Sequence, residues 1–114
     1  MPNHVYIDKK ILPFHRTINI SADKSLSIRT ILLASQAIGI SKISNLLESE
    51  DVLNALRVIK KLGINYKKTK KCYEIHGFGL NGYNPKNNTL INAGNSGTLG
   101  RLILSLLIKT KKKI

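Results

Sequence analysis

The stretch SEDVLNALRVIKKLGINYKKTKKCYEIH, residues 49–76, decides the fold. In its first half, apolar residues recur every three or four positions, which predicts an amphipathic helix. Ser49 and the two acids after it suit a helix start, and Gly63 suits a helix end. In its second half, β-prone runs at 64–68 and 72–76 flank a Lys-rich turn, which predicts a hairpin. A helix followed by an antiparallel hairpin indicates a mixed α/β fold.

The residues before this stretch continue the alternation of helix and strand. Apolar residues of 24–38 also follow helical spacing, and Ser21 and Asp23 offer oxygens that suit an N-cap. We expect that helix to end at Gly39. The alternating residues 40–46 then predict a short strand.

The two ends of the chain complete the pattern. Residues 5–20 mix β-formers with polar residues and predict one or two short strands, the second at 16–20. After a Gly- and Pro-containing loop at 77–88, residues 90–92 predict a short strand, and the apolar run 99–108 predicts a helix buried against something large. The predicted order is one βαβαββ unit, about residues 20–80, followed by the start of a second, about 88–114.

Length and composition place the chain among small cytosolic proteins. Its 114 residues suffice for one small domain, and no apolar run approaches the ~20 residues that cross a bilayer. The N-terminus lacks the basic and apolar segments of a secretory leader, so we expect a cytoplasmic protein with no membrane partner. Cys72 stands alone, so neither an internal disulfide nor a thiolate zinc site is expected; we expect a half-buried strand residue and no metal.

The strong positive charge does not by itself indicate nucleic-acid binding. The chain has 19 Lys and Arg against 6 Asp and Glu, but 15 of the bases are Lys and the aromatic content is 5%. Nucleobase recognition usually combines Arg with aromatic side chains. Ile, Lys and Asn make up 42 of the 114 residues, as an AT-rich coding sequence would produce. No nucleic-acid partner is expected, although a small basic RNA- or DNA-binding module remains an alternative.

Two segments have the composition of anion sites. In SADKSLSIR, residues 21–29, Lys24, Ser25 and Arg29 crowd the first turns of a predicted helix, where free N–H groups already favour anions. In AGNSGTLGR, residues 93–101, glycines allow close approach of a ligand to backbone N–H groups just before a helix that begins near Ser96. Either segment is also compatible with an ordinary helix cap.

Together, DKSLSIR, ISNLLESEDVLNALRVIKKLGI, GFGL and AGNSGTLGRLI resemble the N-terminal part of the 5-enolpyruvylshikimate-3-phosphate synthase (3-phosphoshikimate 1-carboxyvinyltransferase) family. The resemblance runs from about residue 18 to 107. It implies an incomplete inside-out α/β barrel built of βαβαββ repeats. It also implies a cofactor-free and metal-free transfer of the enolpyruvyl group of phosphoenolpyruvate to the 5-hydroxyl of shikimate 3-phosphate, in aromatic amino acid biosynthesis.

The resemblance also implies roles for individual residues. Lys24, Ser25 and Arg29 would bind shikimate 3-phosphate, and Lys24 and the backbone of Gly97 would bind phosphoenolpyruvate. The catalytic acid and base are not assigned in this chain, because the family carries them in later repeats. A nearby alternative is the related transferase that acts on UDP-N-acetylglucosamine, in which an Asn usually follows the early lysine where this chain has Ser25.

The chain departs from the family pattern in three respects. Ser21 and Ala22 stand where the family usually has Pro-Gly, and Ile28 stands where His or Asn is common. Family members are also several-fold longer, with two domains of three repeats each. We therefore expect residues 1–114 to form a partial domain that is weakly active or inactive alone, with the remainder of the enzyme as a partner.

Overall fold

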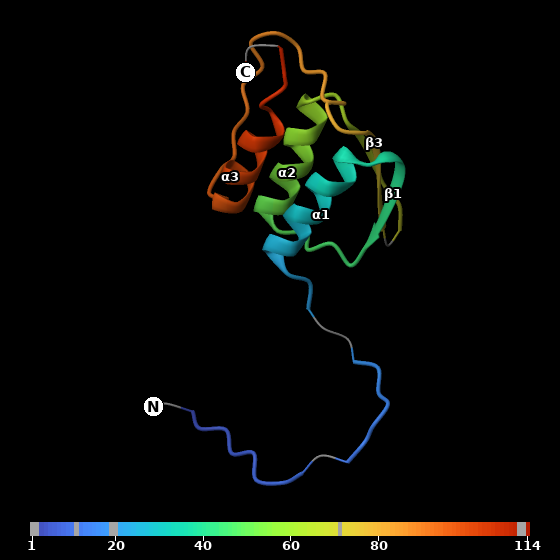
Figure 1. The fold of residues 1–114 in the computed structure, drawn as a ribbon, viewed down its shortest axis with the longest axis vertical. Helices are drawn as coiled ribbons and strands as arrows, with labels where there is room; N and C mark the ends of the chain where they lie inside the picture. The colour runs from blue at the N-terminus through green and yellow to red at the C-terminus, as the bar shows by residue number, and fades with distance from the viewer. Residues whose placement is uncertain (1–2, 11, 19–20, 71, 112–113) are drawn as a thin grey trace.

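In the computed structural model, a compact body follows an extended N-terminal arm (Figure 1). The structure describes residues 3–10, 12–18, 21–70, 72–111 and 114. The elements of the body, in order, are α1 (Lys24–Gln36), β1 (Ile38–Ser44), α2 (Glu50–Lys61), β2 (Asn65–Lys68), β3 (Cys72–Phe78) and α3 (Gly97–Leu106). The mixed α/β class and the order of these six elements confirm the sequence prediction.

The three strands form one antiparallel sheet in the order β1-β3-β2. Tyr66 pairs with Ile75 in the predicted hairpin, and Ser41 pairs with Ile75 from the other side. Because side chains alternate along a strand, Tyr73 and Ile75 point to the buried face of the sheet. Cys72 is half-buried on β3, as predicted.

The helices lie on one side of the sheet in two layers. α1 and α2 pack on the buried face of the sheet, and α3 packs on α1 away from the sheet (Figure 1). The fully buried Ile28, Ile31, Leu56 and Ile59 join the two inner helices to Ile75 in one core. Burial of each such side chain contributes about 1.5–3 kcal/mol, so this cluster holds the body together.

Local capping explains where two of the helices begin. Asp23 accepts a hydrogen bond from the backbone N–H of Leu26 (2.7 Å), and Ser96 accepts one from that of Leu99 (3.0 Å). These bonds satisfy N–H groups that the first turn of a helix leaves free. Asp23 was one of two predicted N-cap residues for α1, and a helix was predicted to begin near Ser96. Ser49 occupies the N-cap of α2, but its hydroxyl makes no cap hydrogen bond.

The strands predicted before α1 and before α3 are wrong in the part of the chain that the structure describes. Residues 3–10 and 12–18 form no strand, and residues 19 and 20 of the second predicted strand lie outside the described residues. Phe14 and Ile18 are about three-quarters exposed, so no described segment covers these two side chains. Residues 90–92 likewise form no strand. A strand needs a hydrogen-bonded neighbour, and β-prone composition alone does not provide one.

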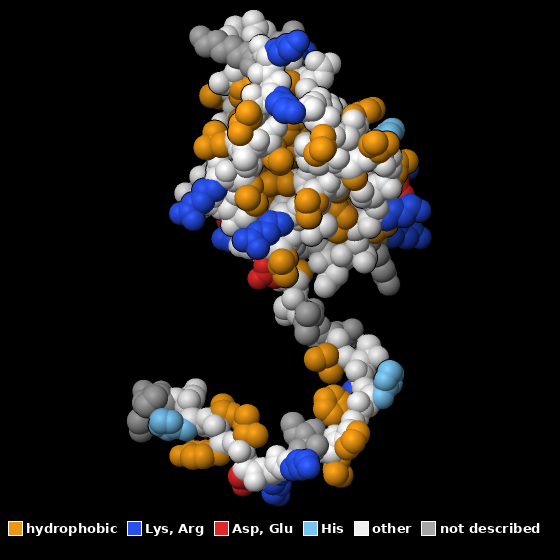
Figure 2. Space-filling view, viewed as in Figure 1, with side chains coloured by type: hydrophobic (Ala, Val, Ile, Leu, Met, Phe, Trp, Pro, Cys, Tyr) orange, Lys and Arg blue, Asp and Glu red, His pale blue; other side chains and the backbone are white. Residues whose placement is uncertain are grey.

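The prediction for the last helix is correct in position and half correct in burial. α3 buries Leu99 and Ile103, whereas Leu104 and Ile108 are more than two-thirds exposed. A groove of about 510 Å³ runs beside α3 between residues 90–93 and the C-terminal residues. Figure 2 shows apolar side chains on the face of the body and along the arm. The chain therefore leaves apolar surface open on the side of α3 that faces away from α1.

Candidate functional site

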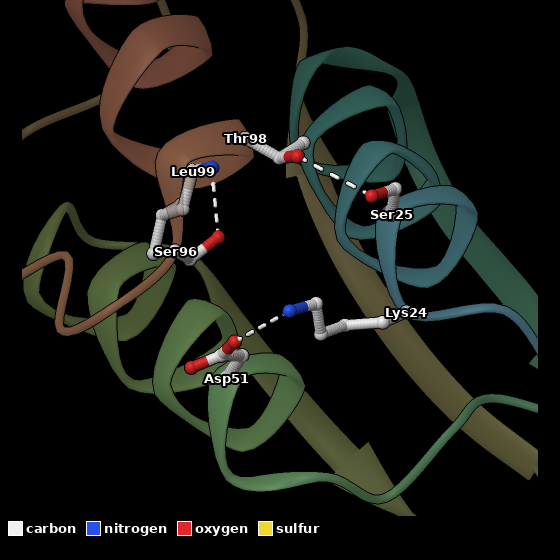
Figure 3. Close-up of polar contacts among 6 residues, drawn as sticks. All are labelled: Lys24, Ser25, Asp51, Ser96, Thr98 and Leu99. Carbon is white, nitrogen blue, oxygen red and sulfur yellow. Dashed lines mark hydrogen bonds and ion pairs between the residues drawn. The ribbon is translucent and has the colours of Figure 1, made fainter.

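The first turn of α1 contacts the first turn of α2 through an ion pair. Lys24 Nζ lies 3.1 Å from Asp51 Oδ2, and about half of the Lys24 side chain is exposed (Figure 3). An ion pair this open to solvent contributes about 0–1 kcal/mol. Asp51 therefore orients the Lys24 ammonium without holding it tightly, and an anionic ligand could compete for the same charge.

The first turn of α1 also contacts the first turn of α3. Ser25 Oγ lies 3.4 Å from Thr98 Oγ1, a long hydrogen bond that joins two segments 73 residues apart (Figure 3). Arg29 lies one helical turn after Ser25, is exposed, and lines the groove between α1 and α3. Ser25 and Arg29 thus face α3, whereas Lys24 faces α2.

The first turn of α3 presents open backbone N–H groups. Ser96 caps the helix by accepting from Leu99, and within the described residues the N–H groups of Gly97 and Thr98 have no acceptor. A Cβ atom added to Gly97 would meet nothing within 4 Å. The side of Gly97 is therefore open, and a ligand oxygen has room to reach these N–H groups.

These contacts bring three helix N-termini to one end of the body. All three helices begin at the end near the arm, side by side (Figure 1). Each helix N-terminus carries a partial positive charge of about half a unit, and Lys24 adds a full charge between them. The first turn of α2 also carries Glu50 and Asp51, whose negative charges offset part of this positive charge. The arrangement suits a ligand with one or two anionic groups.

The structure thus places Lys24, Ser25 and Gly97 at one end of the body, with Arg29 one turn away along α1. Asp51 was predicted only as an acid that suits a helix start, and its contact with Lys24 lay beyond reach of the sequence. The link between Ser25 and Thr98 was missed for the same reason: nothing in a sequence says which two helix starts will meet.

The structure shows where Ile28 lies, the residue that stands where the family commonly has His or Asn. This side chain is fully buried in the core beneath α1, where an apolar residue packs without any polar group to satisfy. Ile28 therefore points away from the open end that Lys24 and Ser25 occupy. Ala22 is half-buried and leads directly into the cap residue Asp23.

Two other classes of feature are absent from the described part of the chain. No helix there has both the length and the apolar character needed to span a membrane. No three His, Cys, Asp or Glu side chains among the described residues lie together as ligands for a metal ion.

The family model described as EPSP synthase (3-phosphoshikimate 1-carboxyvinyltransferase) matches residues 9–114. Among curated relatives, the 3-phosphoshikimate 1-carboxyvinyltransferase of Streptococcus suis is 40% identical over 92 residues, which cover 80% of this chain and 21% of that protein. The enzyme of the same name from Rhodopseudomonas palustris is 42% identical over 89 residues, covering 77% of this chain and 20% of that protein.

A solved structure agrees with the sequence matches. EPSP synthase from Acinetobacter baumannii matches with a TM-score of 0.69 and 32% sequence identity, over 79% of this chain and 20% of that chain. This similarity shows that the mixed α/β fold of the chain is that of the matching part of EPSP synthase. The chain spans about one fifth of the length of the relatives it matches.

Proposed function

The chain belongs to the EPSP synthase family, and from this premise we propose that it contributes the first part of an enzyme that transfers the enolpyruvyl group of phosphoenolpyruvate to shikimate 3-phosphate. The observation that carries the proposal is the meeting of the α1 and α3 starts, where Ser25 contacts Thr98 beside the open Gly97. Both substrates are anions that such an end can attract.

Each predicted residue has a proposed role that its place supports. Lys24 contacts both substrates, since its side chain is about half exposed and its ammonium lies between the starts of α1 and α2. Ser25 and Arg29 bind shikimate 3-phosphate from one face of α1, where they lie four residues apart. The backbone N–H of Gly97 donates to phosphoenolpyruvate.

In the proposed reaction, the 5-hydroxyl of shikimate 3-phosphate adds to phosphoenolpyruvate, and phosphate leaves from the tetrahedral adduct. The positive groups of this chain stabilise the charge that develops on the leaving phosphate. The acid and base of the reaction are expected in the rest of the family's length. The two alternatives considered from the sequence, a nucleic-acid module and the UDP-N-acetylglucosamine transferase, are not favoured by the matches.

We further propose that residues 1–114 form a partial domain, with one repeat over about 20–80 and the start of another over about 88–114. The remainder of the enzyme is the proposed partner, and it covers the apolar surface beside α3. Without it the chain is weakly active or inactive. The proposed location is the cytoplasm.

A binding experiment tests the proposed site. The chain is labelled with ¹⁵N and titrated with shikimate 3-phosphate, then with phosphoenolpyruvate, while backbone amide signals are followed by NMR. We expect signals from the first turns of α1 and α3 to move, and we expect Lys24→Ala to abolish the movement. Lys42→Ala on β1 is a matched control, because that lysine is exposed on the sheet and pairs with Glu74 of β3, not with a residue of the site. Equal movement in both variants would contradict the proposal.

A further inference from the structure

The segment that leads into α3 is held by two side chains of α2. Asn54 Nδ2 donates a hydrogen bond to the backbone carbonyl of Asn92 (2.7 Å), and Lys61 Nζ donates one to that of Leu90 (3.0 Å). Asn54 and Lys61 are seven residues apart, so they lie on the same face of α2, two turns from each other. Residues 90–92 therefore run along α2 in the opposite direction to it.

A chain of short-range bonds continues from Asn92 to the start of α3. The Asn92 side chain accepts from the N–H of Gly94 (2.8 Å), and the N–H of Ser96 donates to the carbonyl of Ala93 (3.2 Å). Ser96 then caps α3. Ala93, Gly94 and Ser96, which lie between the anchored carbonyl and the helix, thus each take part in a short-range hydrogen bond. The direction of the first turn of α3 therefore follows where Asn92 is held.

Gly94 places the turn close against the same side chain. Its φ is +59°, a left-handed conformation that glycine adopts without strain. A Cβ atom added there would lie 3.4 Å from Asn54 Nδ2. Asn54 therefore donates to the carbonyl of Asn92 and lies beside Gly94, where a side chain would come up against it.

We propose that Asn54 is a positioning residue that sets the direction in which the first turn of α3 presents the N–H groups of Gly97 and Thr98. It acts through Asn92 and touches no ligand. Lys61 anchors the same segment farther from the helix and has no such effect on Gly97. The identity of the ligand rests on the proposed function, whereas the positioning of the Gly97 N–H is a property of the chain itself.

The experiment compares Asn54→Leu with Lys61→Met in the whole chain. Both new side chains are close in size to the original ones; Asn54→Leu removes the carboxamide that donates to Asn92, and Lys61→Met removes the ammonium that donates to Leu90. Amide signals are recorded without ligand and during titration with inorganic phosphate, and urea unfolding reports stability. We expect Asn54→Leu to shift the Gly97 and Thr98 signals in the free chain and to weaken phosphate binding by about fivefold, the effect of one ordinary hydrogen bond. We expect Lys61→Met to leave both as in the original chain.

Two results would overturn the positioning role. One is an Asn54→Leu chain whose Gly97 and Thr98 signals match those of the original chain. The other is an equal shift of those signals in Lys61→Met, which would make Asn54 one of two interchangeable anchors. If the original chain binds no phosphate, the proposed function fails at this site, and the ligand-free spectra still decide the positioning role.

Discussion

The substitution Gly97→Ala tests whether Gly97 is needed for ligand binding or for the stability of the fold. Gly97 is the first residue of α3, and it is not among the glycines with positive φ. An added Cβ meets nothing within 4 Å. Replacing such a glycine by alanine restricts the unfolded chain, so we expect the free energy of unfolding to rise by about 0.4–1 kcal/mol.

The same methyl group stands on the open side that a ligand would use. If it keeps a phosphoenolpyruvate oxygen from the N–H of Gly97, the loss is that of one hydrogen bond to a charged group, about 1.5–3 kcal/mol. This loss corresponds to a roughly ten- to hundredfold weaker affinity. The variant is therefore expected to be more stable and to bind less.

Urea unfolding and NMR titration with phosphoenolpyruvate, in the presence of shikimate 3-phosphate, measure the two effects. Gly77→Ala is the matched control, because a Cβ there would clash with the backbone carbonyl oxygens of Ala37 and Ala34. We expect this control to lose about 1–3 kcal/mol of stability or more. A Gly97→Ala chain that is destabilised, or that binds phosphoenolpyruvate as the original does, would refute the reasoning.

Three further predictions concern the stability of the body. Ser35 donates to a backbone carbonyl of its own helix and lies 2.6 Å from the Tyr83 hydroxyl, so Tyr83 donates to Ser35. Ser35→Ala removes the Ser35 oxygen that accepts from this buried hydroxyl and should cost about 1–3 kcal/mol in urea unfolding, more than Tyr83→Phe at about 0.5–1.5 kcal/mol; equal costs would contradict this direction. Asp23→Ala removes the cap of α1 and should cost about 1 kcal/mol by thermal unfolding, whereas Asp23→Ser should retain most of it. The hydrogen bond from Lys68 lowers the pKa of Glu48, so the stabilisation from this pair is present above about pH 4.5 and is lost as the pH falls further. Lys68→Met should therefore reduce the loss of unfolding free energy at acid pH. An unchanged loss would exclude the pair as its source.

Much of the local structure could be predicted because its signals act within a few residues. Asp23 and Ser96 cap helices whose N–H groups lie three positions away, and Gly63 ends α2 with a positive φ. The hairpin pairs Lys68 with Tyr73 across a short turn. Local signals gave a wrong prediction at residues 90–92, where β-prone composition predicted a strand. No strand of the described part of the chain lies beside these residues, and side chains of α2 hold them instead.

The sequence by itself determined the alternation of helix and strand, the helix caps, the family, and the two segments rich in groups that favour anions. Only the tertiary structure decided which of those groups meet. The contacts of Lys24 with Asp51, Ser25 with Thr98 and Asn54 with Asn92 join residues 27, 73 and 38 positions apart. The first two contacts depend on how α1 packs against α2 and α3, and the third on how residues 90–92 lie against α2. That packing follows from burial of the whole core, which no short segment encodes.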